Sequence, residues 1–133
     1  MTMNLRTATR TSRAQVIVND CGANAKLKLY NGTRPSGVNA IVGGNTLLAS
    51  GAFGAVIGVA TAAAVDFDEA GFTQTSSGFV AGTPTFADLT TSADVIITRI
   101  DIAAGVGNWQ FSGAVVNGQN LTLTALLLPE GNA

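Results

Sequence analysis

The chain has 133 residues, of which 47% are hydrophobic and 11% charged, with a formal net charge of −1, no histidine and a single cysteine. This length suits a single domain over residues 1–133, and a core of this size is stable without disulfides or metals. The composition excludes a disulfide framework, a cysteine-rich zinc site and every site built on histidine.

The few charges are segregated along the chain. Residues 1–34 carry six basic side chains and one acidic side chain, a net charge of +5, whereas residues 35–133 carry one basic and seven acidic, a net charge of −6. This pattern favours head-to-tail contacts between subunits. Direct nucleic-acid binding is not expected, because it usually needs a larger basic excess.

The first predicted element is a helical arm over about residues 4–19. Thr2 or Asn4 is a suitable cap for its start, and Gly22 follows where a left-handed residue commonly ends a helix. Helical spacing predicts a modest inward stripe. Its members are Leu5, Ala8, Ser12 and Val16.

A neighbouring face of the same helix carries three arginines. Arg6, Arg10 and Arg13 are spaced four and three residues apart, and Ile17 follows four residues later, so all four share one face. Two interpretations stay open. The face is either solvated or docked on an acidic partner surface, because guanidinium groups pair well with carboxylates.

After the helix the hydrophobic period changes from 3.6 to 2. Residues 26–30 alternate polar and apolar side chains, which predicts a half-buried strand followed by a turn at Asn31-Gly32. Residues 46–49 are a second short strand. Residues 55–65 suit a strand or a helix, and their β-branched residues and Gly58 favour the strand that we predict.

The remainder of the chain is predicted to be β-structure. Residues 66–93 combine Gly, Ser and Thr with spaced phenylalanines, which is typical of short strands and turns. Residues 94–102, 109–116 and 120–128 are clear strand candidates, and an Asn-Gly turn at 117–119 joins the last two. Seven or eight strands after one helix predict a mainly β fold: an antiparallel β-sandwich or jelly-roll-like domain with one N-terminal α-helix.

Carboxylates do not form a recognisable catalytic or metal site. The cluster of Asp66, Asp68 and Glu69 cannot be an EF-hand, because the closing position of such a loop is Ser77. A looser calcium site stays open beside the simpler interpretation of a solvated turn. Asp94 and Asp101 have an odd separation, so they point to opposite faces of a regular strand and cannot act together as acid and base.

The sequence offers no base that could activate a nucleophilic side chain. There is no histidine, and Lys26 and Lys28 lie inside a predicted strand. Cys21, at the negative end of the helix dipole, is interpreted as a small packing residue. We therefore expect no enzyme, no catalytic residue, no cofactor and no metal. Trp109 is interpreted as a core residue, with stacking on a sugar as the alternative.

A membrane role is not expected either. Residues 35–65 contain no charged side chain, but their apolar part is shorter than the ~20 residues that a spanning helix requires. The N-terminal residues also lack the apolar region of a secretory signal. Arg99 and Asp101, two residues apart, are expected to share a face and form a minor ion pair.

Four segments carry a resemblance to a known family: KLKLYNGTRP at 26–35, GNTLLASGAFG at 44–54, AGTPTFADL at 81–89 and LTLTALLLPEGN at 121–132. Together with the leading helix, their order resembles the small structural proteins of tailed bacteriophages and prophages. In that family a helix leads into a strand and turn, a second strand follows, and a β-sandwich completes the domain. One departure is Asp88, where the family pattern has a basic residue.

The resemblance implies a non-enzymatic virion structural protein, in the first place a head decoration or cement protein. Such a protein bridges major capsid subunits and stabilises the capsid as a homo-oligomer on the virion surface, after synthesis in the bacterial cytoplasm. A neck or tail component and a virion-surface carbohydrate-binding module are the alternatives. The implied partners are the major capsid protein and copies of the chain itself. Four side chains are candidates for these contacts: Arg6, Arg10, Arg13 and Arg34.

Overall fold

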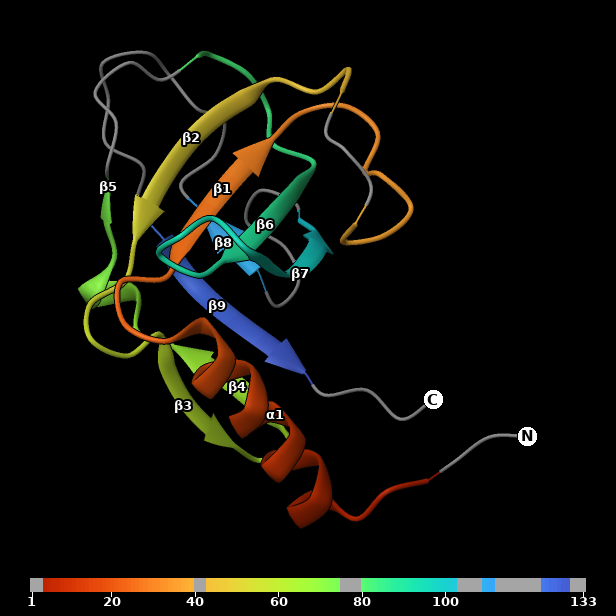
Figure 1. The fold of residues 1–133 in the computed structure, drawn as a ribbon, viewed down its shortest axis with the longest axis vertical. Helices are drawn as coiled ribbons and strands as arrows, with labels where there is room; N and C mark the ends of the chain where they lie inside the picture. The colour runs from red at the N-terminus through yellow and green to blue at the C-terminus, as the bar shows by residue number, and fades with distance from the viewer. Residues whose placement is uncertain (1–3, 40–42, 75–79, 103–108, 112–122, 130–133) are drawn as a thin grey trace.

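Figure 1 shows the fold in a computed structural model that describes residues 4–39, 43–74, 80–102, 109–111 and 123–129. These residues form one α-helix, nine β-strands and a short 3-10 helix. All strand pairs are antiparallel and belong to two sheets. The predicted mainly β fold with one N-terminal helix is confirmed, and the two sheets are consistent with a β-sandwich-like arrangement.

The five-stranded sheet, here sheet A, has the strand order β5-β2-β1-β6-β7. Its strands are β1 (Lys26–Tyr30), β2 (Leu47–Ala52), β5 (Thr73–Gln74), β6 (Phe86–Thr90) and β7 (Ile96–Asp101). The four-stranded sheet, here sheet B, has the order β3-β4-β9-β8. Its strands are β3 (Gly58–Thr61), β4 (Ala64–Phe67), β8 (Trp109–Phe111) and β9 (Leu123–Pro129). The helices are α1 (Thr7–Cys21) and the 3-10 helix η1 (Glu69–Gly71).

Helix α1 begins three residues later than predicted and ends two residues later. Its N-cap is Arg6, without a side-chain capping hydrogen bond, so the suggested caps Thr2 and Asn4 are wrong. Gly22 ends the helix as predicted, with a positive φ of 67° and an amide that donates to a carbonyl of the last turn at 3.4 Å. The helix is too short to cross a membrane, and no other helix of the described residues is long and apolar enough to do so.

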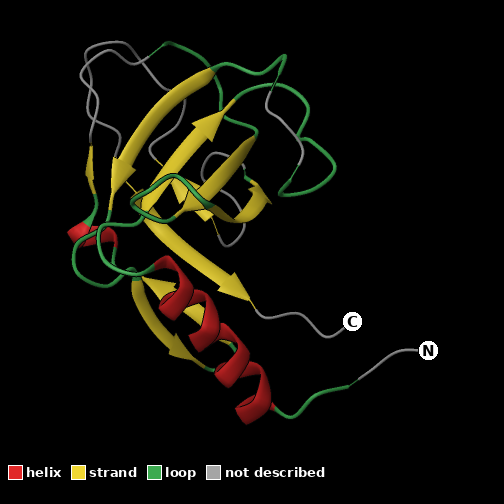
Figure 2. Cartoon of the chain, in the orientation of Figure 1, coloured by secondary structure: helices red, strands yellow, loops and turns green. Residues whose placement is uncertain are grey.

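The predicted inward stripe of α1 is wrong. Its members are exposed or half-buried: Leu5, Ala8, Ser12 and Val16. The buried side chains lie on another face: Ala14, Val18 and Cys21. This face packs on β3 and β4, and small Ala14 and Cys21 let the helix approach them closely (Figure 2). The Thr11 hydroxyl accepts a hydrogen bond from the Ala63 amide at 2.8 Å, which fixes the position of α1 along the hairpin.

Strand β1 occupies the predicted residues, and its alternation of side chains is confirmed. Leu27 and Leu29 are buried, whereas Lys26, Lys28 and Tyr30 on the other face are half-buried. The strand is central in sheet A, because it pairs with β2 on one side and β6 on the other. The Asn31-Gly32 turn also follows, with a positive φ of 79° at the glycine.

Residues 55–65 form extended structure as predicted, but as two strands of a hairpin. Strands β3 and β4 are joined by Ala62 and Ala63, whose φ angles of 46° and 63° are left-handed. Turns of this kind usually contain Asn or Gly. Alanine gives no turn signal in the sequence, and the hairpin was therefore not predicted.

The core contains an aromatic cluster of Phe53, Phe67 and Phe72. The ring of Phe53 lies 5.6 Å from that of Phe67 and 5.3 Å from that of Phe72, measured between centroids. Phe72 lies against β2 at Gly51, where any Cβ atom would overlap its ring. The cluster thus links β2, β4 and the segment after η1 into one core.

The later strands also follow the predictions, in shorter form. Strand β7 lies within residues 94–102, and β8 starts at the predicted residue 109. Strand β9 begins three residues later than predicted and ends one residue later. The predicted turn at 117–119 and the side chain of Trp109 lie outside the described part, so both predictions stay as they are.

Candidate interaction surfaces

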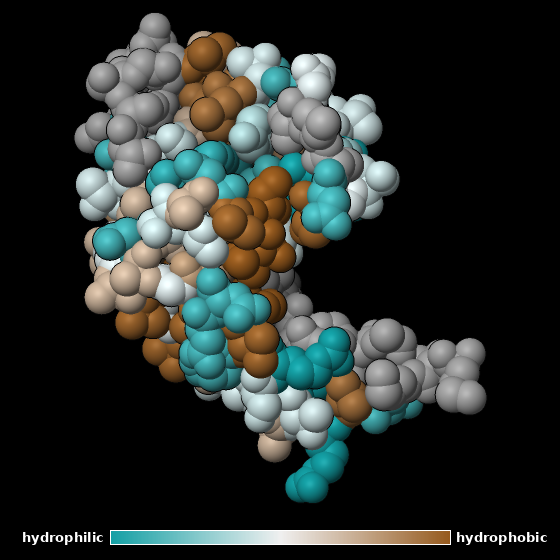
Figure 3. Space-filling model, viewed as in Figure 1, coloured by the Kyte–Doolittle hydropathy of each residue, from teal (hydrophilic) through white to brown (hydrophobic). Residues whose placement is uncertain are grey.

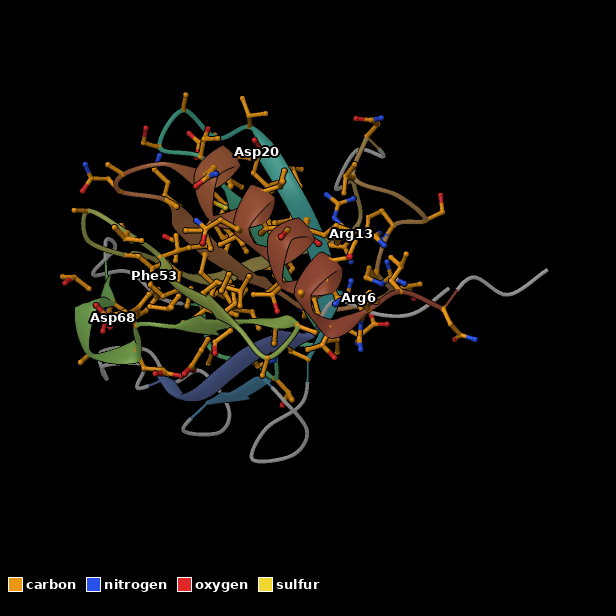
Figure 4. All side chains as sticks on the ribbon, turned by 90° about the horizontal axis from the view of Figure 1, so that it is seen from below. Arg6, Arg13, Asp20, Phe53 and Asp68 are labelled. Atoms are coloured by element: carbon orange, nitrogen blue, oxygen red, sulfur yellow. The ribbon has the colours of Figure 1, made fainter. Side chains whose placement is uncertain are left out.

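One flank of α1 carries the three arginines that the sequence grouped together. We call Arg6, Arg10 and Arg13 the arginine flank. Arg6 and Arg13 are exposed and Arg10 is half-buried. In Figure 4, Arg6 and Arg13 lie on the same side of the helix, whereas Asp20 lies at its other end. Arg6 is the N-cap with extended backbone, so it precedes the helix, and the shared side is seen for Arg6 and Arg13 alone.

The other four basic side chains form ion pairs within the chain. The Nζ atoms of Lys26 and Lys28 lie 3.0 and 2.8 Å from Oδ1 of Asp94. The Nε atom of Arg34 lies 2.8 Å from Oδ1 of Asp101. Arg34 therefore has an acidic partner in its own chain, although both side chains of this pair remain partly exposed.

The predicted ion pair between Arg99 and Asp101 is wrong. Antiparallel register places Arg99 directly opposite Asp88 and places Asp101 opposite Phe86. Arg99 therefore pairs with Asp88 through two hydrogen bonds, from Nε to Oδ1 at 2.6 Å and from Nη2 to Oδ2 at 3.0 Å. Cross-strand register, rather than sequence proximity, chooses the partner.

The Asp88 and Arg99 pair is buried, with exposed fractions of 1% and 7%. Hydrogen bonds to Asp88 raise the pKa of Arg99, so its charge is held firmly. Nη1 of Arg99 donates to the carbonyl of Gly37 at 2.8 Å, which ties the loop after β1 to sheet A. Phe86, 5.8 Å below the guanidinium, stacks in turn on Tyr30 at 5.2 Å. Asp88 is thus a structural residue.

Asp94 differs from Asp88 because it is exposed. Hydrogen bonds from Lys28 and then Lys26 lower its pKa below the usual value of 3.8. It lies in the turn before β7, whereas Asp101 ends that strand, and each binds its own basic partner. Asp94 lies before β7 with a positive φ of 67°, so the argument from alternation along a regular strand does not apply to it.

The cluster at Asp66 and Asp68 lies at the end of β4 and the start of η1. Both carboxylates are exposed, and Oδ1 of Asp68 accepts a hydrogen bond from the Gly71 amide at 3.1 Å, which caps η1. Across the described residues, no three metal-binding side chains come together. The cap accounts for Asp68 as a turn residue.

A hollow of about 440 Å³ lies beside this cluster. We call it the acidic hollow. It is lined by Val56, Gly58, Val59, Asp66, Phe67 and Asp68. Two of its valines are strongly exposed, Val56 at 53% and Val59 at 67%. In Figure 3 hydrophobic surface is visible at the lower left, where β3 begins. The sequence did not reveal this hollow, because its walls depend on the unpredicted hairpin.

Cys21 is buried, and burial, with a smaller effect of Asp20, raises its thiol pKa to about 11. A thiol of this kind is a poor nucleophile at neutral pH. This agrees with its interpretation as a packing residue.

The uncharged residues 35–65 do not all lie at the surface. Several of them belong to the core, among them Leu48, Phe53 and Ile57. Others on the same stretch are exposed, including the two valines of the acidic hollow. The lack of charge in residues 35–65 is therefore explained in part by the burial of some of these side chains in the core.

Comparisons with known proteins add no relative. No protein-family model matches the chain, and no curated protein or solved structure is significantly similar to it. The similarity of its motifs to phage structural proteins stays a prediction, and function is argued from the geometry of the described residues.

Proposed function

We propose that this chain is a non-enzymatic structural protein of a virion, a decoration or cement protein that assembles with copies of itself on the capsid. It bridges major capsid subunits and stabilises the head. The supporting observation is where the chain places its charge: an arginine flank on one side and an acidic hollow on the other.

Asp68 of the acidic hollow lies across the molecule from the arginine flank, although β3, which also lines the hollow, packs on α1. In Figure 4, Arg6 and Arg13 lie at the opposite side of the view from Asp68, with Phe53 of the core between them. Four further basic side chains pair with carboxylates around sheet A: Lys26, Lys28, Arg34 and Arg99. Opposite charges on opposite sides suit a subunit that repeats across a surface, because each copy presents complementary groups to its neighbours.

A decoration protein acts by adding buried interface between capsid subunits. Individual contacts can be weak, since a copy held by several neighbours gains avidity. The buried Asp88 and Arg99 pair holds the loop after β1 on sheet A through the carbonyl of Gly37. Neither catalysis nor a cofactor is required.

The test is the copy number of this chain in purified particles from cells that carry its gene. Quantitative mass spectrometry measures the chain against the major capsid protein. We expect one copy per major capsid subunit or another simple ratio to it. Six or twelve copies per particle would refute a decoration role and indicate a neck or tail component, and absence from the particle would refute a virion role altogether.

A further inference from the structure

The arginine flank and the acidic hollow have complementary chemistry. Exposed Arg6 and Arg13 of the flank are followed by Val16, which lies three residues after Arg13 on the neighbouring face of α1 and is 53% exposed. Val16 therefore places an apolar side chain beside the C-terminal end of the positive surface.

The acidic hollow also combines exposed apolar side chains with charged ones, but its charges are negative. Its apolar part is formed by Val56 and Val59, and the carboxylates of Asp66 and Asp68 stand beside it. Asp66 lies opposite Val59 in the antiparallel pairing of β3 and β4, so both side chains leave the hairpin on the same face. Strand β3 is the edge of sheet B among the described strands, which leaves this face accessible from the side.

We infer that the arginine flank of one copy docks in the acidic hollow of the next copy. Val16 packs against Val56 and Val59, while Arg6 and Arg13 pair with Asp66 and Asp68. Charge complementarity selects a second copy as the occupant, because each chain carries both halves of the contact. This inference rests on the proposed assembly role, and it names the surfaces that hold the assembly together.

The contact is head-to-tail rather than two-fold symmetric. The two surfaces lie on different sides of the molecule (Figure 4), so one copy cannot satisfy both halves with the same neighbour by a two-fold axis. Successive copies therefore form a closed ring or an extending row. Either form suits subunits laid over a capsid lattice.

The first experiment reverses each charged surface separately. One variant carries Arg6→Glu with Arg13→Glu, and the other carries Asp66→Lys with Asp68→Asn, in which asparagine preserves the cap on η1. Arg10 is left unchanged because it is half-buried. A control carries Ala8→Glu with Gln15→Glu, which places negative charge on the opposite, exposed flank of α1.

Sedimentation equilibrium of the isolated protein measures self-association without any particle. We expect the wild type and the control to associate at low salt and to dissociate as salt rises, because screening weakens exposed ion pairs. Each charge variant alone should be monomeric, and an equimolar mixture of the two should associate again. The mixture restores both contacts: Glu meets Lys at one interface, and native Arg meets native Asp at the other.

A monomeric wild type would overturn the inference, as would variants that still associate or a mixture that stays monomeric. The copy number in particles is measured separately. A virion protein that lacks this contact would be present in particles but monomeric in solution, whereas a self-associating protein that is not part of a virion would show the reverse.

A second experiment avoids charge changes. Chains with Val16→Cys and chains with Val59→Cys are mixed under a mild oxidant, and both sites are exposed, so folding is preserved. We expect a disulfide-linked dimer in the mixture and none with either variant alone; the reverse pattern contradicts the head-to-tail contact.

Discussion

Two regions of the molecule use charged side chains in opposite ways. On sheet A, Asp88 and Arg99 are buried and bind each other, and Arg99 also holds the loop at Gly37. On α1 and the β3–β4 hairpin, Arg6 and Asp66 are exposed, and α1 packs through small side chains such as Ala14. The chain, with only 11% charged residues, thus buries some of its charges in the fold and leaves others at the surface.

The largest expected effect comes from breaking the buried pair on sheet A. Asp88→Ala leaves the guanidinium of Arg99 buried without a carboxylate, which should lower the free energy of unfolding by about 3–5 kcal/mol. Urea unfolding followed by circular dichroism measures the loss.

The double variant Asp88→Leu with Arg99→Met is the control. It removes both charges, so it should be clearly more stable than Asp88→Ala. If the double variant is as unstable as the single one, the effect comes from packing and the contrast between the two regions weakens.

The second effect tests the hairpin region. A Cβ atom at Gly58 would overlap the carbonyl oxygen of Asp66 and lie 2.7 Å from Cα of Phe67. Because backbone cannot move aside easily, Gly58→Ala should cost about 1–3 kcal/mol. Thermal unfolding measures the change, with Gly54→Ala as the control, since nothing lies within 4 Å of a Cβ atom there. Equal effects of the two substitutions would contradict the close approach of β3 and β4.

A smaller effect is expected where α1 meets the hairpin. Thr11→Val removes the acceptor of the Ala63 amide and should cost about 1 kcal/mol. Hydrogen exchange at Ala63 should become faster. Thr9→Val, at an exposed helical position, makes the same chemical change without this contact. Unchanged exchange at Ala63 in the Thr11 variant would show that the hydroxyl does not hold the helix.

The smallest effect concerns the exposed rim of sheet A. Hydrogen bonds from Lys28 and Lys26 lower the pKa of Asp94, so this carboxylate stabilises the fold above its usual pKa of 3.8. That contribution is lost as the pH falls through the lowered pKa in the folded state. Melting temperatures of the wild type and Asp94→Asn should therefore differ slightly at neutral pH and converge in acid. A difference that grows in acid would have the wrong sign.

Local patterns predicted much of the fold. Strict alternation in residues 26–30 defined β1, because one face of that strand is buried and the other is not. The inward face of α1 was not predictable in this way. Its buried positions include Ala14 and Cys21, which are small because the helix approaches β3 and β4 closely, and a hydrophobic pattern does not mark them. The Ala62-Ala63 turn likewise has no sequence signal, since alanine rarely adopts a positive φ.

The candidate surfaces also differ in how far the sequence alone could predict them. The arginines were grouped from helical spacing in the sequence, although Arg6 precedes the first helical residue as the N-cap. The partner of Arg99 depends on the register between β6 and β7, which brings Asp88 opposite it from eleven residues away. The acidic hollow depends on how β3 and β4 pair, so no single stretch of sequence contains it.

The order of strands in sheet B has a consequence for synthesis of the chain. Helix α1 and the β3–β4 hairpin lie within the first 67 residues, so this unit can form early on the ribosome. Strand β4 pairs with β9, in which Leu128 lies opposite Val65. One edge of β4 therefore has no partner until β9 has been synthesised. During that interval one edge of β4 presents unpaired amides and carbonyls, a template for pairing between nascent chains. Pairing with β9 covers this edge in the finished sheet.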